Sequence, residues 1–315
     1  MRVLLWATPA SRPAVTARLR RIEGLDLVSV DNEQAVIDAL PDAEVLALQV
    51  FHYTPAVAAA VRETAKKLRL IQILTVGYDR LVNAGIPPHI TLATAGDSLG
   101  TVVAEHTLTL MLSLLRRVPE ALAMQGKRQW DSGMMGRMTS LDGKTVAVVG
   151  FGAIGREIGR LSKAFGSHVI GLSRSATPHP SADEVMPVTR LAEALARADI
   201  VAVATPLTGE TRGMFDAARF EQMKTGAFLI NIARGPVVDT TALMDALTSG
   251  KLAGAGLDVT DPEPPPPDHP LWTLPNVILT PHVAVAGGSY RLAEFVGASF
   301  EGMMRGEPPL SVIRL

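Results

Sequence analysis

The chain has 315 residues, 47% of them hydrophobic and 19% charged, and its 30 Lys and Arg nearly balance 31 Asp and Glu. This composition is typical of a folded α/β protein with more than one domain and excludes global disorder. The net charge of −1 and the absence of cysteine argue against nucleic-acid binding, disulfides and thiolate metal sites, so no metal site is expected. The start is only briefly apolar and no uninterrupted apolar stretch reaches membrane-spanning length, so we expect a cytoplasmic protein without a membrane partner.

Short apolar runs alternate with helical patterns in the first third of the chain. The predicted strands are 2–6, 25–30, 45–48 and 70–74, and the predicted helices are 14–21, 32–40 and 55–66. This alternation indicates βαβ units and a parallel sheet. A loop at 86–89 ends the pattern, and a long apolar stretch at 99–124 predicts a buried helix that connects domains or subunits. We expect 125–140 to be a loop or arm.

A glycine-rich turn in the middle of the chain organises the second half. The apolar run 146–149 leads into Gly150, Gly152 and Gly155, and a helical pattern follows. These glycines permit the tight turn, the approach of a phosphate and close helix packing, while Ala153 and Ile154 lie in the first helical turn. We predict a dinucleotide site here; the alternative is an ordinary glycine turn before a helix.

A second αβ pattern follows the glycine turn. Its predicted strands are 167–172, 200–204, 227–232, 253–257 and 277–280, and its predicted helices are 191–197, 215–222, 240–248 and 288–304. The first of these strands ends in Ser173-Arg174-Ser175, without the acidic residue that binds the ribose hydroxyls of NAD. Arg174 and its serine neighbours can bind a 2′-phosphate, which predicts NADP. Alternatively, Arg174 is a solvated turn residue and the protein uses both NADP and NAD as cofactor.

Several separated segments give the chain a family resemblance. They are TVGYD (75–79), VAEH (103–106), GFGAIG (150–155), TPLTGETR (205–212), NIARGPVVD (231–239), GLDVTDPEP (256–264) and LTPHV (279–283). In this order they resemble the D-isomer-specific 2-hydroxyacid dehydrogenases, most closely the glyoxylate/hydroxypyruvate reductases. The resemblance implies two doubly wound parallel-sheet domains. A Rossmann cofactor domain (99–284) is inserted in a flavodoxin-like substrate domain (1–98 and 285–315).

The resemblance implies a catalytic set of Arg234, Glu263 and His282. Reduction of a 2-oxo acid needs a cation for the carboxylate, and the guanidinium fork of Arg234 suits that role. It also needs a proton donor that works near neutral pH, which indicates His282. Glu263 would hold the histidine tautomer and stabilise the imidazolium. Read singly, the three are a salt-bridge partner, a solvated loop carboxylate and a loop histidine, but all follow successive strands of one parallel sheet.

Further positions are carried over from the family. The backbone N–H groups of Val76 and Gly77 resemble a second clamp for the substrate carboxylate. The nicotinamide side of the cofactor site matches Thr101, Thr205, Pro206, Ala233 and Asp258. Phe51 and Tyr53 would form an aromatic wall that favours a compact or apolar-tailed substrate. The other histidines are expected to be structural or on the surface, with His106 packed in its helix.

The leading hypothesis is an NADPH-dependent reductase of glyoxylate, hydroxypyruvate or a similar 2-oxo acid. One alternative is an NAD-dependent enzyme that oxidises a 2-hydroxy acid, and another is a cofactor-sensing binding protein of the same fold. Related enzymes dimerise through the cofactor domain, so we expect a homodimer built on 99–124 and 125–140, with Trp130, Met134 and Met135 near the partner. The alternative is a helix buried within one subunit.

Overall fold

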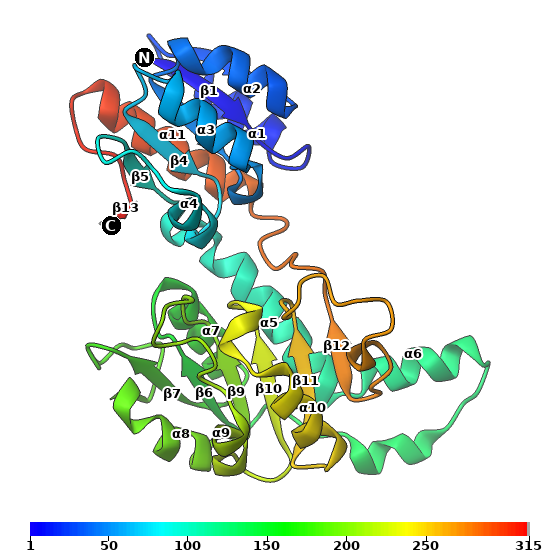
Figure 1. Cartoon of the computed structure of the whole chain (residues 1–315). Helices are drawn as coiled ribbons and strands as arrows, with labels where there is room; N and C mark the ends of the chain where they lie inside the picture. The colour runs from blue at the N-terminus through cyan, green and yellow to red at the C-terminus, as the bar shows by residue number, and fades with distance from the viewer. Residues whose placement is uncertain (314–315) are drawn as a thin grey trace. The chain divides into compact units, whose positions relative to one another are not determined.

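The structure, a computed structural model, describes residues 1–313 of the chain. The chain divides into two compact units (Figure 1). Unit 1 consists of Met1–Leu99 together with Val285–Leu315, and unit 2 consists of Gly100–Ala284. The first boundary lies one residue beyond the expected one, and each unit contains its own sheet.

The sheet of unit 1 has the strand order β13-β5-β4-β3-β1-β2. Its parallel strands give the flavodoxin-like order 2-1-3-4-5, and β13 is added antiparallel to β5. The strands are β1 (Arg2–Trp6), β2 (Asp26–Ser29), β3 (Val45–Leu48), β4 (Leu70–Ile73), β5 (Thr91–Ala93) and β13 (Val312–Ile313).

The last helix of the chain packs on the first helix of unit 1. Arg18 of α1 forms ion pairs with Glu294 (3.0 Å) and Glu301 (2.9 Å) of α11, and Gly297 leaves room for the guanidinium. The helices of this unit are α1 (Arg12–Leu19), α2 (Glu33–Ala39), α3 (Pro55–Glu63), α4 (Asp79–Ala84) and α11 (Ser289–Met304). The 3-10 helices in the described part of this unit are η1 (Leu40–Asp42), η2 (Val50–His52) and η3 (Gly96–Leu99).

The sheet of unit 2 is fully parallel, in the order β12-β11-β10-β9-β6-β7-β8. This is the Rossmann order 3-2-1-4-5-6 with one further strand at the end. The two doubly wound sheets predicted from the sequence are thus confirmed. The strands are β6 (Thr145–Val149), β7 (His168–Ser173), β8 (Glu184–Pro187), β9 (Ile200–Val203), β10 (Ala227–Asn231), β11 (Leu252–Leu257) and β12 (Val277–Leu279). β8 escaped prediction because it is a short edge strand, only partly buried and with proline at its end.

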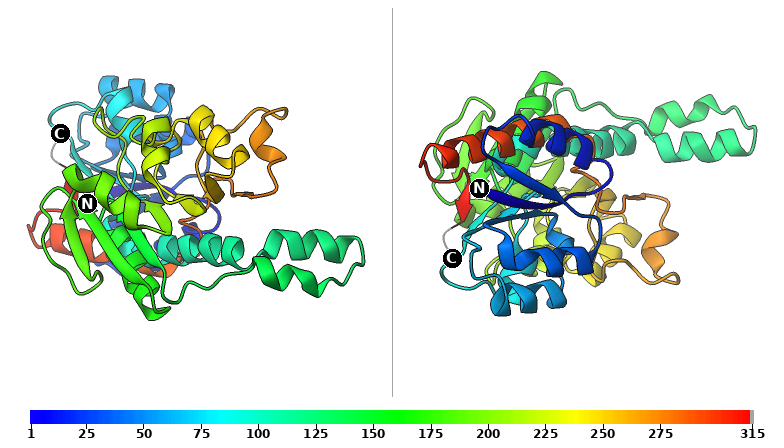
Figure 2. Two further views of the ribbon diagram at one scale, coloured as in Figure 1. Left: turned by 90° about the horizontal axis from the view of Figure 1, so that it is seen from below. Right: turned by 90° about the horizontal axis from the view of Figure 1, so that it is seen from above.

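Helices cover both faces of this sheet (Figures 1 and 2). One face packs on α8, α9 and α10 in a hydrophobic core, and α5 and α7 lie together on the other. The helices are α5 (Gly100–Leu115), α6 (Val118–Gly126), α7 (Ala153–Ala164), α8 (Leu191–Arg197), α9 (Ala217–Gln222) and α10 (Thr240–Thr248). The 3-10 helices are η4 (Ser132–Arg137), η5 (Val188–Arg190), η6 (Gly235–Val237) and η7 (Pro270–Trp272).

The prediction of one continuous helix over 99–124 is wrong. The helix is interrupted between α5 and α6, where Arg117 takes a left-handed conformation with φ of 54° and Pro119 follows. Proline lacks the N–H of the next helical hydrogen bond and clashes with the preceding turn, which explains the break. α6 and η4 together form an arm that projects from unit 2 (Figures 1 and 2), and the Trp130 side chain on it is 99% exposed.

The segment Gly96–Leu115, which contains α5, is long and apolar enough to cross a membrane by length and composition alone. In the structure 56% of its most apolar window is buried, as in the core helix of a globular unit. Helix α5 packs on β10, β11 and α7, and its Leu110 and Leu114 lie against the glycines of β11. The apolar character of α5 is therefore explained by packing within unit 2.

Candidate active site

The glycine turn joins β6 to α7 in the way that a dinucleotide site requires. Gly150 has a φ of +98°, and a Cβ on it would lie 2.5 Å from the backbone N of Thr205. A Cβ on Gly155 would lie 2.2 Å from the carbonyl O of Gly150, so only glycine lets α7 pack this closely. A Cβ on Gly152 would meet nothing within 4 Å, which leaves the approach to the helix open.

The amino terminus of α7 is equipped to bind an anion. Its N-cap residue is Gly152, so no side chain caps the first N–H groups of this 12-residue helix. Ala153 and Ile154 are the first two residues of the helix, and their backbone lies at the positive end of the helix dipole. The turn therefore fits the pyrophosphate of a dinucleotide, as the sequence indicates.

The turn after β7 presents the residues predicted to select the cofactor. Ser173 Oγ accepts a hydrogen bond from the backbone N of Ala176 (3.1 Å), and Ser175 Oγ accepts one from Thr177 Oγ1 (3.1 Å). Both hydroxyl hydrogens can therefore still be donated. Arg174 is exposed, and within residues 1–313 its guanidinium forms no hydrogen bond or ion pair. Binding of a 2′-phosphate by these side chains stays a prediction.

The positions expected beside the nicotinamide lie at strand ends or helix starts of unit 2. Thr205 and Pro206 follow β9, and Ala233 follows β10, so they share the carboxyl edge of the sheet with the glycine turn. Thr211 Oγ1 donates to the carbonyl O of Pro206 (2.6 Å) and thereby holds that loop. Thr101 lies in the first turn of α5. Their contacts with a cofactor stay predictions.

Arg234 is placed by the end of β10. Asn231, the last residue of that strand, accepts from the backbone N of Ala233 (3.0 Å) and donates through Nδ2 to the carbonyl O of Arg234 (3.1 Å). The guanidinium of Arg234 donates to the Ala233 carbonyl O (2.7 Å). Asn231, which is buried, is a positioning residue that was not predicted; its signal in the sequence is a polar residue directly after the apolar run 227–230.

His282 and Glu263 form the predicted pair. His282 Nδ1 lies 2.8 Å from Glu263 Oε1, so the ring donates through Nδ1 to the carboxylate. This hydrogen bond leaves Nε2 as the ring atom that can pass a proton to a substrate. Both side chains are partly exposed, 42% for His282 and 35% for Glu263, and both belong to unit 2.

Asp258 anchors the turn that carries His282. Its side chain is buried, and it accepts hydrogen bonds from the backbone N of Val283 (2.9 Å) and of Ala284 (3.0 Å). Its carbonyl O accepts from the backbone N of His282 (2.9 Å). The predicted role of Asp258 was a contact with the nicotinamide carboxamide, which stays untested; the structure assigns its carboxylate a structural role as well.

The residues expected to contact substrate in unit 1 behave differently from one another. Phe51 is 49% exposed, whereas the ring of Tyr53 is only 4% exposed and belongs to the hydrophobic core. Tyr53 OH donates to the carbonyl O of Gly85 (3.4 Å), and burial raises the pKa of its phenol to about 12. The prediction that Phe51 and Tyr53 together form an aromatic wall is therefore wrong for Tyr53, whose ring is buried in the core. His52 stands next to Phe51, and its ring stacks at 3.9 Å on that of Trp6.

Val76 and Gly77 follow β4 at the carboxyl edge of the unit 1 sheet. Thr75 Oγ1 donates to the carbonyl O of Gly77 (3.4 Å). In the part of the chain that the structure describes, residues 1–313, neither backbone N–H of this pair donates a hydrogen bond. Their availability is compatible with the expected carboxylate clamp, which stays a prediction.

The sequence relatives of the chain include dehydrogenases and reductases. A family model described as "D-isomer specific 2-hydroxyacid dehydrogenase, NAD binding domain" matches residues 108–284. The glyoxylate reductase of Korarchaeum cryptofilum is 34% identical over 291 residues, which are 90% of this chain and 86% of the relative. The D-3-phosphoglycerate dehydrogenase of Archaeoglobus fulgidus is 31% identical over 321 residues, and the chain spans only 59% of its length.

Solved structures with the same fold cover nearly the whole chain. A D-isomer-specific 2-hydroxyacid dehydrogenase family protein of Aeromonas salmonicida has a TM-score of 0.88 and 30% identity, and the match covers 99% of this chain and 98% of the other. The NADPH-dependent glyoxylate/hydroxypyruvate reductase of Sinorhizobium meliloti, solved with NADP and sulfate, has a TM-score of 0.85 and 25% identity, with coverage of 99% and 98%. The NAD-dependent formate dehydrogenase of Staphylococcus aureus, solved with NAD, has a TM-score of 0.78 and 25% identity, with coverage of 100% and 99%. The chain therefore belongs to the D-isomer-specific 2-hydroxyacid dehydrogenase family, and glyoxylate reductases are among its relatives.

Proposed function

We propose that the protein reduces a small 2-oxo acid, such as glyoxylate or hydroxypyruvate, to the 2-hydroxy acid with NADPH, and that it forms the D isomer where the product is chiral. The observation that carries the proposal is the pair of His282 and Glu263, whose 2.8 Å hydrogen bond leaves Nε2 of the ring available. The relatives named glyoxylate reductase support this substrate class.

The chemistry follows from the side chains of unit 2. His282 gives the proton from Nε2 to the oxygen that becomes the hydroxyl, and Glu263 stabilises the imidazolium and holds its tautomer. The guanidinium of Arg234 binds the carboxylate of the substrate and polarises the neighbouring carbonyl. A bound nicotinamide supplies the hydride. The residues of the chain thus orient the substrate, place charge and move one proton.

NADPH is proposed in preference to NADH because of the turn after β7. A carboxylate there would repel a 2′-phosphate, and this turn offers the guanidinium of Arg174 and two hydroxyl groups. The Sinorhizobium meliloti reductase, which is NADPH-dependent, supports this choice, while the NAD-bound formate dehydrogenase shows that the fold serves both cofactors.

The test measures the oxidation of NADPH and of NADH by their absorbance with a panel of 2-oxo acids, and the chirality of the product by chromatography. We expect glyoxylate or hydroxypyruvate to be reduced with NADPH at the higher kcat/KM, and hydroxypyruvate to give the D product. A higher kcat/KM with NADH would contradict the cofactor assignment. Binding of either cofactor without turnover of any acid would contradict the enzymatic proposal and favour a cofactor-sensing protein.

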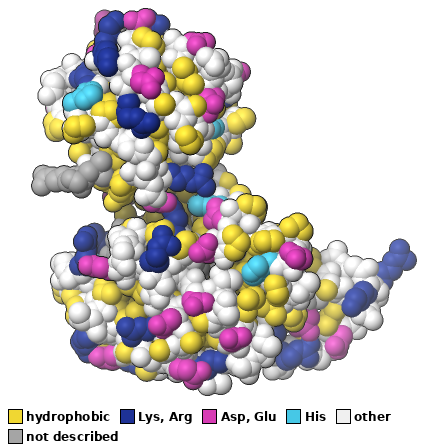
Figure 3. All heavy atoms as spheres, in the orientation of Figure 1, with side chains coloured by type: hydrophobic (Ala, Val, Ile, Leu, Met, Phe, Trp, Pro, Cys, Tyr) yellow, Lys and Arg dark blue, Asp and Glu magenta, His cyan; other side chains and the backbone are white. Residues whose placement is uncertain are grey.

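We also propose a homodimer formed by unit 2. The arm of α6 and η4 exposes several large apolar side chains, namely Val118, Leu122, Trp130 and Met135. Lys and Arg side chains lie at its outer end (Figure 3). Exposed apolar side chains on a projecting segment are typical of an interface with a partner. Analytical ultracentrifugation tests this, and a particle of 33.4 kDa, the mass of one chain, would contradict it.

A further inference from the structure

Helix α5 lies on strand β11 in a register set by glycines. Two glycines of β11 lie beneath leucines of α5, such that a Cβ on Gly254 would lie 3.2 Å from Leu114 Cδ2 and a Cβ on Gly256 would lie 2.9 Å from Leu110 Cβ. Four helical residues rise about 6 Å and two strand residues about 6.6 Å, so the same step repeats along both elements. One further step brings His106 over Asp258, and Nε2 of the histidine lies 3.3 Å from Asp258 Oδ1.

Counting donors assigns the tautomer of His106. The hydroxyl of Thr280 has one hydrogen, and it donates that hydrogen to Asp258 Oδ1 over 2.6 Å. Thr280 Oγ1 lies 2.9 Å from His106 Nε2, so in this contact the hydroxyl accepts and the histidine donates. The ring nitrogen Nε2 of His106 therefore carries a proton. A directed chain of hydrogen bonds runs from His106 through Thr280 to the buried carboxylate of Asp258.

This chain ends at the turn that carries His282. Asp258 accepts from the backbone N–H groups of Val283 and Ala284 through its carboxylate, and from that of His282 through its carbonyl O. His282 itself has a φ of +54°, which is uncommon for a residue other than glycine, although histidine adopts it more often than most residues do. Such a conformation persists only where the surrounding contacts determine it. Here these contacts include the three hydrogen bonds to Asp258 and a further one from the backbone N of His282 to the carbonyl O of Thr280 (3.0 Å).

We propose that His106 is a positioning residue for His282. By donating to Thr280, it directs the threonine hydroxyl to Asp258, and it thereby keeps the 280–284 turn in the geometry that places His282 against Glu263. The inference rests on the proposed function for its catalytic consequence, but the geometry itself can be measured without turnover.

The experiment compares three substitutions in the full-length protein. His106→Leu removes the donor, His106→Gln keeps an N–H near the position of Nε2, and His89→Leu changes an exposed histidine of unit 1 as the control. We expect His106→Leu to lower kcat about tenfold to a hundredfold, the effect of a slightly misplaced catalytic group, while KM for the 2-oxo acid changes little. His106→Gln should recover most of that kcat, and the control should match the wild type.

The second readout is the NMR signal of the His282 ring, assigned by its loss in His282→Gln. In His106→Leu this signal should shift, because the contact with Glu263 is disturbed, and in His106→Gln it should return. An unshifted His282 signal in His106→Leu, or equal kcat values for the Leu and Gln variants, would overturn the inference. If the wild type reduces no 2-oxo acid, the proposed function fails and the NMR signal alone decides the inference. Should His106→Leu not fold, Thr280→Val and Thr280→Ser replace it, since only serine keeps the hydroxyl.

Discussion

Two histidine–carboxylate pairs lie at opposite edges of the unit 2 sheet. His168 starts β7, and its Nε2 lies 3.1 Å from Oε1 of Glu184, which starts β8, so this pair belongs to the amino-terminal edge. His282 lies beyond β12 and Glu263 beyond β11, so their 2.8 Å pair belongs to the carboxyl edge. Ligands of parallel α/β sheets bind at the carboxyl edge. The two hydrogen bonds are similar in length, but only the pair at the carboxyl edge lies where a ligand is expected to bind.

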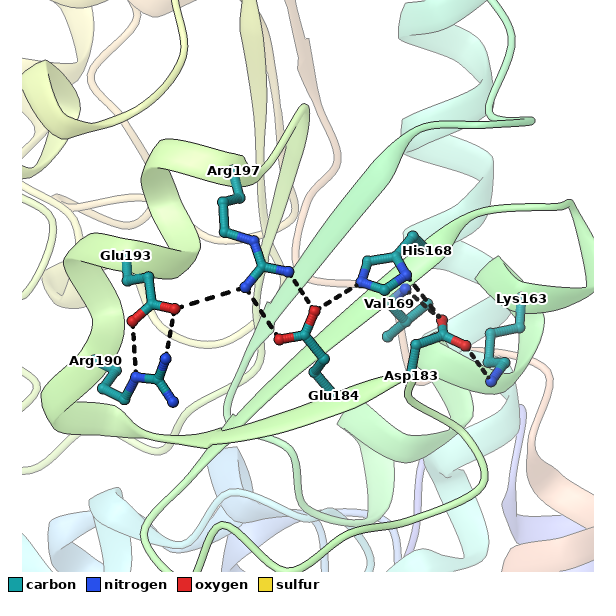
Figure 4. A network of polar contacts seen from close by, with 8 residues as sticks. All are labelled: Lys163, His168, Val169, Asp183, Glu184, Arg190, Glu193 and Arg197. Atoms are coloured by element: carbon teal, nitrogen blue, oxygen red, sulfur yellow. Dashed lines mark hydrogen bonds and ion pairs between the residues drawn. The ribbon is translucent and has the colours of Figure 1, made fainter.

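The pair at the amino-terminal edge is part of an exposed network of charges (Figure 4). Glu184 pairs with Arg197 as well as with His168, and Arg197 also pairs with Glu193. The Arg197 guanidinium and then the His168 ring hold the pKa of Glu184 at about 2. Every member of the network has a charged partner at the surface, which is typical of a structural ion-pair network.

The pair at the carboxyl edge is built differently. The backbone of His282 is held in a left-handed conformation by the buried Asp258, whereas His168 lies in regular strand geometry. The carboxylate of Asp258 accepts hydrogen bonds from the backbone of the turn and not from the imidazole ring of His282. In this protein, backbone anchoring at the carboxyl edge distinguishes the candidate proton donor, whereas the length of the histidine–carboxylate hydrogen bond does not.

The largest expected effect comes from substituting His282, with His168 as the control. His282→Gln should lower kcat for 2-oxo acid reduction by about a hundredfold to ten-thousandfold, because the general acid is lost. His168→Gln, the matched control at the other edge, should leave kcat unchanged. Steady-state kinetics with NADPH check both. Equal kcat values for the two variants would remove the distinction between the edges.

Glu263→Gln tests the role of the carboxylate at the carboxyl edge through the pH dependence of the reduction rate. An amide cannot stabilise imidazolium as a carboxylate does, so the falling limb of the reduction rate should move to lower pH. Each unit of displacement corresponds to about 1.4 kcal/mol of lost interaction, and kcat should fall about a hundredfold. The measurement is a pH profile of kcat, with Glu184→Gln as control. A profile that coincides with that of the wild type would contradict the role of Glu263.

Arg174→Ala tests the cofactor turn, which shares the carboxyl edge with His282. Losing one charge-assisted contact with a 2′-phosphate costs about 1.5–3 kcal/mol, so kcat/KM for NADPH should fall roughly tenfold to a hundredfold. The value for NADH should stay the same, because NADH lacks this phosphate. Arg190→Ala, which disrupts the exposed ion pair with Glu193, is the control. An equal loss with both cofactors would mean that Arg174 does not select between them.

The smallest effect is expected for stability at the amino-terminal edge. The pKa of Glu184 is lowered from 4.5 to about 2, so its ion pairs stabilise the folded state above about pH 4.5, and this contribution is lost as the pH falls towards 2. The Glu184 side chain is 36% exposed and solvent screens its ion pairs, so Glu184→Gln should reduce the free energy of unfolding at neutral pH by only about 1 kcal/mol or less. Urea unfolding at neutral pH and near pH 3 checks this. A loss that does not shrink at the lower pH would contradict the electrostatic origin.

Local patterns predicted much of the fold. The apolar runs of β1, β3, β6 and β9 and the glycine turn at 150–155 follow from side-chain periodicity and from the φ that Gly150 adopts. The predictions failed where one local feature outweighed the pattern. Pro119 divided the long apolar helix, and the aromatic residues 51 and 53 looked alike although Tyr53 is a core residue. The spacing of apolar residues could not show that Phe51 is exposed and Tyr53 buried, because they lie in and directly after a 3-10 helix, where side chains do not alternate between two faces as they do in a strand.

The parts of the candidate site could be predicted from the sequence alone: the glycine turn, Arg174 after its strand, and the motifs that contain Arg234, Glu263 and His282. Three features depend on contacts between distant segments: the 2.8 Å pairing of His282 with Glu263, the anchoring of the His282 turn by Asp258, and the contact of His106 with Thr280, 174 residues further along the chain. Local sterics and periodicity act over a few residues and can be read from the sequence. Contacts between distant segments depend on how strands and helices stack, and here two glycines of β11 set that stacking.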